Sequence, residues 1–240
     1  MSKPGASVPV HRVRFVDWSP SAITALALSP VAWTESAAAG RSVLAIGRDN
    51  GNIDLCTWCE GQSGSIAQGW SPIWTLLGEE NYKIESLAFT ASASHLRLFS
   101  TSGGSIVSEH FLPSSLTGQQ AADTRTPTRT LSSHGGAIWS MAASPTGKFL
   151  AIGCEDGVVR LIDVAGDAFE HVGTGMHVAP RMTRVASRIL SLAWGPPRRQ
   201  MATSNDSDDD DDEAWRDTYL LGGLGNSTAA VWDVPTGQLR

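Results

Sequence analysis

The chain has little cysteine, little lysine and no long apolar run. Only 3 of its 240 residues are cysteine, an odd number that argues against a disulfide framework and for a reducing compartment. The first fifteen residues carry no apolar core of the signal-peptide kind. The longest apolar stretch, residues 18–34, contains Pro20 and Pro30 and falls short of a bilayer span. The sequence therefore predicts neither a disulfide-rich secreted domain nor a membrane protein.

Charge is unevenly distributed along the chain. The formal net charge is −6, but seven acidic residues lie together at 206–213, and the other 17 balance the 18 basic residues. Only a short segment is therefore acidic, and the body of the chain is about neutral. Most of the bases are arginine, which favours planar, forked contacts to anions.

One pattern of short apolar runs recurs four times, and it predicts an all-β fold. Each copy begins at an isoleucine: Ile23, Ile84, Ile138 and Ile189. Val, Ile and Leu alternate with other residues at a period of two, which is typical of strands. Asn-Gly and Asp-Gly pairs separate two such runs, where a tight hairpin needs positive φ. Candidates for a fourth, outer strand precede each copy at 8–16, 73–77, 128–131 and 169–173.

These copies resemble WD repeats, and the resemblance implies a β-propeller. The third copy carries the pattern at His134, Ser144, Gly147, Asp156 and Asp163, and the fourth ends in Trp232 and Asp233. The units extend over about 8–58, 73–112, 128–164 and 169–234. In WD repeats the positions of His134 and Asp156 meet within a blade. Because Ile162 replaces the tryptophan that usually completes this chain, we expect His134 and Asp156 to hydrogen-bond to each other.

Longer segments are similar to the amino-terminal propeller of the cirhin family, the WD-repeat subunits of the small-subunit processome. They include VHRVRFV at 10–16, CEDG at 154–157 and RILSLAW at 188–194. The resemblance implies a non-catalytic scaffold in the nucleus and nucleolus that supports processing of pre-ribosomal RNA. Its implied partners are other WD-repeat and helical-repeat subunits of a processome subcomplex, and pre-ribosomal RNA. No cofactor, small-molecule substrate or membrane is implied.

Family members are longer, and their propeller has about seven blades. Because only four units are present, we expect residues 8–240 to form a partial, four-bladed propeller. We expect residues 1–7 to be a disordered N-terminus. The first and last units would then each expose an apolar face, because repeat stability depends on contacts between neighbours. Such a chain should self-associate.

Two groups of residues could in principle bind a metal or catalyse a reaction, but structural roles are favoured for both. Cys56 and Cys59 form a Cys-x-x-Cys pair, but there is no second pair, so a packed, reduced thiol is favoured over metal binding. His134, Asp156 and Ser140 would suit nucleophilic catalysis, but a blade interior gives a substrate no access. The sequence predicts no catalytic residue, no metal site and no cofactor.

Five arginines and no acid occupy residues 176–199, namely Arg181, Arg184, Arg188, Arg198 and Arg199. Guanidinium groups hold phosphate by charge and by forked hydrogen bonds, so this stretch is a candidate for binding RNA or an acidic partner. The alternative is a solvated loop between blades.

The acidic run lies within residues 196–218, which we expect to form a disordered insertion. It would either cover a basic surface or only add solubility. Ser204 and Ser207 precede acids and are candidates for phosphorylation.

Two other classes of function stay open. One is a generic WD-repeat adaptor, such as a substrate-receptor subunit of a ubiquitin ligase. The other is an enzyme, for which no coherent site is found.

Overall fold

The computed structural model describes residues 21–30, 42–59, 69–78, 82–91, 96–112, 129–173, 182–199 and 215–240. Every regular element in these ranges is a β-strand, as the period-two alternation predicts. None of the described segments forms a helix that could cross a bilayer. The all-β class and the repeated sheets are confirmed.

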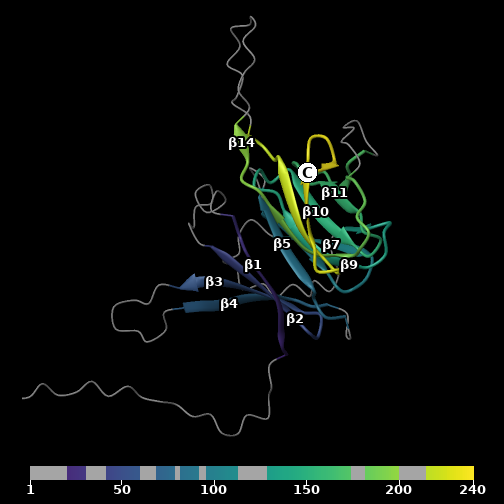
Figure 1. Ribbon diagram of the computed structural model, residues 1–240. Helices are drawn as coiled ribbons and strands as arrows, with labels where there is room; N and C mark the ends of the chain where they lie inside the picture. Colours follow the sequence, from purple (N-terminus) through teal and green to yellow (C-terminus); the bar gives the residue numbers. More distant parts are fainter. Residues whose placement is uncertain are drawn as a thin grey trace, which may run out of the picture.

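In the described residues, four antiparallel sheets of four strands and one two-stranded sheet make up the fold (Figure 1). Sheet 1 contains β1 (Ile23–Leu28), β2 (Val43–Arg48), β3 (Ile53–Cys59) and β4 (Gly69–Leu76). Sheet 2 contains β5 (Ser86–Ala91), β6 (Leu96–Thr101), β7 (Ile106–Phe111) and β8 (Arg129–Ser132). Sheet 3 contains β9 (Ile138–Ala143), β10 (Phe149–Cys154), β11 (Val159–Asp163) and β12 (Glu170–His171). Sheet 4 contains β13 (Ile189–Trp194), β16 (Tyr219–Leu224), β17 (Ala229–Asp233) and β18 (Gln238–Leu239).

Each outer strand pairs with the sheet that precedes it in the chain. β4 pairs with β3, β8 with β7 and β12 with β11. The sequence units instead place these strands at the head of the following unit. The outer strand of sheet 4, β18, is only two residues long and pairs Leu239 with Trp232. The remaining candidate, 8–16, lies outside the described residues, as do residues 1–7.

The hairpins between the second and third strands turn at glycines with positive φ. Gly51 has φ 84° and Gly157 has φ 76°, a region that favours glycine. At the first turn, Arg48 N donates to Asn52 O at 2.9 Å. These turns confirm the two tight hairpins that the Asn-Gly and Asp-Gly pairs predict.

Three apolar clusters lie between successive sheets. The first joins sheets 1 and 2 and includes Val43, Leu55 and Leu87. The second joins sheets 2 and 3, and the third joins sheets 3 and 4 around the fully buried Trp232. The inner strands β1, β5, β9 and β13 follow one another in contact. The sheets therefore stack side by side like propeller blades.

A buried ion pair also ties sheet 2 to sheet 3. Arg97 on β6 has a side chain only 1% exposed, and its Nε donates to Glu109 Oε1 at 2.6 Å. Its two Nη groups donate to three carbonyls that follow β11, those of Val164, Gly166 and Ala168, at 2.7–2.8 Å. The charged fork thus replaces the hydrogen bonds that Arg97 would make with water.

Glu109 completes this network with a second arginine. Its Oε2 accepts from Arg129 Nε at 2.6 Å. Burial acts to raise the pKa of Glu109, but the hydrogen bonds from Arg129 and Arg97 outweigh it and hold the pKa below its usual range. The carboxylate is therefore ionised and paired.

Polar contacts likewise tie sheet 3 to sheet 4. Asp217 is 7% exposed, and its carboxylate accepts from both the backbone N and the hydroxyl of Thr146. On the same pair of sheets, Trp194 Nε1 donates to Ala142 O at 2.9 Å. Each interface among the last three sheets therefore combines apolar packing with directed hydrogen bonds.

Candidate interaction surfaces

The structure separates the arginines that the sequence groups together. Arg184 and Arg188 precede the first residue of β13, whereas Arg198 and Arg199 form β14 after its last residue. A six-residue strand is about 20 Å long, so the two pairs lie at opposite ends of sheet 4. Arg181 lies outside the described residues. The five arginines therefore do not form one patch.

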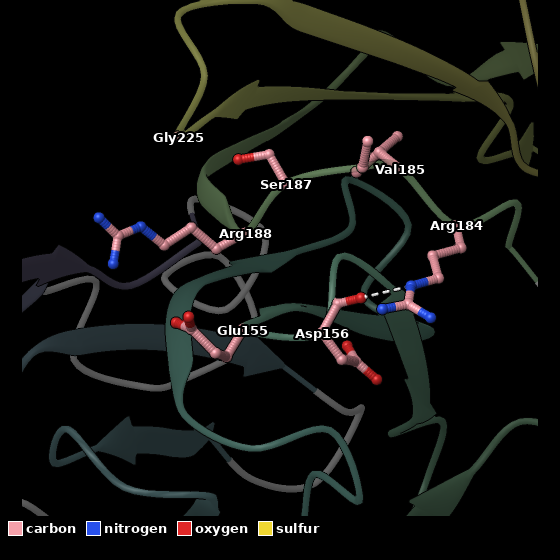
Figure 2. Close-up of a pocket in the computed structure, with 8 residues that line it drawn as sticks. Glu155, Asp156, Arg184, Val185, Ser187, Arg188 and Gly225 are labelled. Atoms are coloured by element: carbon pink, nitrogen blue, oxygen red, sulfur yellow. Dashed lines mark hydrogen bonds between the residues drawn. The ribbon is translucent and has the colours of Figure 1, made fainter.

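A hollow of about 680 Å³ opens where sheets 3 and 4 meet (Figure 2). The turn between β10 and β11 forms one wall, the segment before β13 forms another, and the turn between β16 and β17 contributes a glycine. Its lining residues are Glu155, Asp156, Arg184, Val185, Ala186, Ser187, Arg188 and Gly225. Two acids and two arginines face this space, so its charge is mixed.

The two arginines of the hollow differ in how they are held. Figure 2 shows Arg184 reaching the backbone of Asp156, whose carbonyl accepts from Arg184 Nε at 2.8 Å. Arg188 instead lies over the ring of Trp139, with its guanidinium carbon 4.9 Å from the ring centroid. The Trp139 indole N–H donates to the Glu155 carboxylate. Among the described residues no carboxylate forms an ion pair with Arg188, so its donors can meet a partner.

The expected hydrogen bond between His134 and Asp156 is wrong. Both Asp156 oxygens instead accept from Arg160, at 3.0 and 2.7 Å, and this hydrogen bond is the main cause that lowers the pKa of Asp156. Arg160 lies four residues further on, at the start of β11, and reaches back over the turn. His134 is exposed with φ 53°, and its ring lies 5.2 Å from that of His171.

The serine considered for catalysis serves the packing of the sheets. Ser140 Oγ donates to Ile189 O on the next sheet at 3.2 Å. It therefore forms no hydrogen-bonded triad with His134 and Asp156.

The remaining repeat residues also have structural contacts. Trp232 Nε1 donates to Thr183 O at 2.8 Å. Asp163 accepts from the N–H of Ala165 at 2.9 Å, and Asp233 accepts from Arg240 at 2.8 Å. These side chains fix turns and the packing of sheet 4.

In sheet 2 a histidine stands where the fourth copy has its tryptophan. His110 shares a hydrogen bond with Ser100 on the neighbouring strand, with 2.8 Å between Nε2 and Oγ. Burial lowers the pKa of His110 to about 4, against a weaker opposing effect of the Glu109 charge. His110 is therefore neutral at physiological pH and acts as a polar core residue.

A short basic ribbon lies at the other end of sheet 4. β14 (Arg198–Arg199) pairs with β15 (Trp215–Arg216), and Arg198 stands directly opposite Arg216. The guanidinium carbons of Arg198 and Arg240 each lie 5.0 Å from the centroid of the Tyr219 ring. We call Arg198, Arg199, Arg216, Tyr219 and Arg240 the basic ribbon surface. Sequence reasoning missed Arg216 and Arg240 because they are distant in the chain.

The ribbon corrects the expectation of a disordered insertion at 196–218. Both ends of this segment are ordered, since β14 and β15 pair and Asp217 is buried against sheet 3. Pairing fixes the ends because each strand supplies the hydrogen-bond partners of the other. The acidic run, with Ser204 and Ser207, lies outside the described residues.

Cysteine is buried wherever its side chain is described. Cys56 is 5% exposed and Cys154 is fully buried. Burial raises the pKa of the Cys56 thiol, and the Asp54 charge adds to the effect. In the described ranges no group of three or more His, Cys, Asp or Glu side chains is placed to hold a metal ion.

Comparison with known proteins agrees with this fold. The model of the WD domain, G-beta repeat, matches residues 125–163, which extend over β8 to β11. U3 small nucleolar RNA-associated protein 4 of Schizosaccharomyces pombe is 31% identical over 228 residues, covering 95% of this chain and 26% of that protein. The protein of that name from Saccharomyces cerevisiae is 33% identical, over 77% of this chain and 21% of its own. The human homolog is 30% identical, over 82% of this chain and 23% of its own.

The chain is a WD-repeat protein related to the cirhin family. It spans about a quarter of the length of these relatives. The alignment with the relative from Schizosaccharomyces pombe covers 95% of this chain, so it includes residues from all four of its sheets.

Solved structures support the propeller fold. Chains from two structures of the Chaetomium thermophilum polycomb repressive complex 2 superpose with TM-scores of 0.60 and 0.58. The superposition with the TM-score of 0.60 covers 94% of this chain and 42% of the other chain, at 15% sequence identity. The superposition with the TM-score of 0.58 covers 89% of this chain and 37% of the other chain, at 16% identity. At this identity the likeness concerns the fold alone.

Proposed function

We propose that this chain is a WD-repeat scaffold of ribosome biogenesis, acting in the nucleolus within the small-subunit processome. The observation that carries the proposal is the similarity to U3 small nucleolar RNA-associated protein 4 over 95% of the chain. Two of the side chains considered for catalysis have structural contacts that fit a scaffold, since Ser140 donates to the next sheet and Asp156 accepts from Arg160. Its partners would be other WD-repeat and helical-repeat subunits of the assembly, together with pre-ribosomal RNA.

The basic ribbon surface is the better candidate for contact with RNA. Arg198 and Arg216 face each other across the ribbon, and like charges in this position repel. A phosphate bound between them relieves this repulsion and accepts forked hydrogen bonds from both guanidinium groups. In the hollow, by contrast, Glu155 and Asp156 offset Arg184 and Arg188.

The general proposal is tested by purifying the tagged full-length protein from cells and identifying the RNA and proteins that accompany it. Pre-ribosomal RNA, U3 small nucleolar RNA and nucleolar proteins are the expected result. Recovery of a ubiquitin-ligase core without these RNAs would overturn the proposal and favour the adaptor.

The RNA contact is tested by charge reversal at the ribbon. Arg198→Glu with Arg216→Glu should weaken cross-linking to pre-ribosomal RNA and lower the slope of log affinity against log salt by about 1, for the one phosphate bound between the two arginines. Arg184→Glu with Arg188→Glu is the matched control, since it makes the same charge change at the other end of the sheet. If the control weakens RNA cross-linking as much as the ribbon variant does, the assignment to the ribbon is wrong.

A further inference from the structure

The hollow between sheets 3 and 4 has two sides that differ in how their charges are used. Figure 2 shows Arg184 with Asp156 on one side and Arg188 with Glu155 on the other. On the first side the charges are engaged, because both Asp156 oxygens accept from Arg160 and Arg184 Nε donates to the Asp156 carbonyl. A ligand would therefore find unpaired charge on the side of Arg188 and Glu155.

One tryptophan binds both of these charged groups and keeps them apart. The guanidinium of Arg188 lies over the Trp139 ring, 4.9 Å from its centroid, where the face of the ring attracts a cation. The indole N–H at the edge of the same ring donates to the Glu155 carboxylate. Among the described residues neither Arg188 nor Glu155 forms an ion pair. Trp139 itself is 38% exposed, so a cation and an anion flank an accessible aromatic ring.

A glycine makes room for a second donor beside Arg188. A Cβ built on Gly225 would lie 2.9 Å from Arg188 Cγ, 3.1 Å from Arg188 Nε and 3.0 Å from Ser187 Oγ. The hydroxyl and the guanidinium therefore border the same small space, which any side chain at 225 would fill. Within the described residues the Ser187 hydroxyl makes no hydrogen bond, so it and Arg188 can both donate to one bound carboxylate.

Backbone hydrogen bonds fix this wall of the hollow in position. Val185 N donates to Gly157 O in the turn of sheet 3 at 2.9 Å, and Gly225 N in the turn of sheet 4 donates to Arg188 O at 3.0 Å. The segment that carries the donors is thus tied to both sheets. Donors that are already held in place lose less conformational entropy when a ligand binds.

We propose that this side of the hollow binds an extended peptide segment of a protein partner that carries an acidic and a basic side chain two residues apart. The acidic side chain accepts from Arg188 and from the Ser187 hydroxyl, and the basic side chain donates to Glu155. Side chains two residues apart on an extended chain point to the same side, so one peptide reaches both charges. Complementary charges of both signs also discriminate against partners that carry only one sign.

A nucleic acid fits this site less well than a peptide does. Its backbone repeats a negative charge at every phosphate, and the Glu155 carboxylate would repel it. The basic ribbon surface lies at the other end of sheet 4, beyond the six residues of β13. Peptide and RNA can therefore bind at the same time, and each site can be altered without the other.

The test is fluorescence anisotropy of labelled peptides titrated with the full 240-residue chain. The probe repeats Glu-Thr-Lys-Thr three times, since threonine favours an extended chain. Two comparison peptides replace either every lysine or every glutamate by glutamine. We expect saturable binding of the mixed-charge peptide and about tenfold weaker binding of each comparison peptide, because each lacks one set of charge-assisted hydrogen bonds.

Variants of the hollow assign the binding to these residues. Arg188→Met and Glu155→Gln should each weaken binding of the mixed-charge peptide about tenfold, and Glu155→Gln should at the same time strengthen binding of the acidic peptide. Gly225→Ala should weaken binding without changing charge, because its Cβ would displace Arg188 and Ser187.

Two matched controls make the same charge changes outside the hollow. Lys148→Met lies in the turn between β9 and β10 and Glu170→Gln lies on β12, and both residues are exposed. Both variants should bind the mixed-charge peptide as the wild type does.

Four outcomes would each overturn the proposal. They are the absence of saturable binding to the wild type, equal binding of the mixed-charge and acidic peptides, and affinity that survives both Arg188→Met and Glu155→Gln. The fourth concerns a twelve-nucleotide oligouridylate used as an RNA probe. If Arg188→Met weakens its binding as much as that of the peptide, the hollow is an RNA site instead.

Discussion

Replacing Arg97 with methionine should strongly destabilise the junction between sheets 2 and 3. Methionine keeps much of the volume of the apolar stem but removes four hydrogen bonds, one of which is the ion pair with Glu109. Glu109 stays 5% exposed at its side chain and loses one of its two arginine partners. The three carbonyls of the Val164–Ala168 segment lose their charged donor.

The expected cost is about 3–5 kcal/mol, the range for breaking a buried pair by removing one partner. Counting each orphaned acceptor separately, at about 1–3 kcal/mol apiece, would give a larger sum. The acceptors at Gly166 and Ala168 lie in part-buried hydrogen bonds, so water can reach them and the lower range holds. For a chain of this size that corresponds to a fall in Tm of about 6–20 °C.

The assay is urea unfolding followed by circular dichroism at pH 7, comparing the midpoint and slope of wild type and variant. Arg129→Met is the matched control. Arg129 binds the same carboxylate at the same 2.6 Å, but its own side chain is 43% exposed, so its removal should cost only about 1–3 kcal/mol, for the buried carboxylate left with one arginine partner. If the two variants lose equal stability, burial does not set the strength of this network and the reasoning is refuted.

Three further changes should behave as the contacts require. Between pH 6.5 and about 4 the unfolded chain binds a proton at His110 that the folded chain does not. The folded state therefore loses up to about 3 kcal/mol of stability as the pH falls through this window. His110→Gln should flatten this pH dependence, measured by urea unfolding at successive pH values. Gly153→Ala should cost about 1–3 kcal/mol by overpacking, because its Cβ would crowd the next sheet, whereas Gly104→Ala, with open space around it, should leave the thermal midpoint nearly unchanged. Asp217→Ala should lower the free energy of unfolding by about 1–3 kcal/mol, and with it the urea midpoint, because its charged hydrogen bonds to Thr146 are lost. An unaltered midpoint would contradict that role.

The sheets could be predicted because their signals are local. Alternation of apolar residues marks three strands of each sheet, and the glycines at 51 and 157 mark the turns between them. The outer strands are harder to predict: the candidates at 73–77, 128–131 and 169–173 overlap β4, β8 and β12 but are placed in the following unit, and β18, with two residues, has no candidate. Their place is set by pairing with a neighbour already folded.

The candidate site was harder to predict because it depends on competition between distant groups. The repeat pattern pairs His134 with Asp156, but Arg160, four residues beyond the aspartate, offers two donors and a charge and takes the place of the imidazole. Likewise Arg184 and Arg198 are near in sequence, yet a strand separates them. The buried ion pair between Arg97 and Glu109 did leave a signal in the sequence, because Arg97 is a charged residue inside an otherwise apolar central strand.

The pairing of β14 with β15 has a practical consequence for labelling the protein. β14 ends at Arg199, β15 begins at Trp215 and the two strands are paired, so the two ends of an insertion between them are already held together. The entropy of closing such a loop grows only slowly with its length, and folded domains commonly have neighbouring termini. A fluorescent protein or an affinity domain placed at this position should leave the three interfaces between the sheets intact, and would let the chain be followed in cells without a tag at either end.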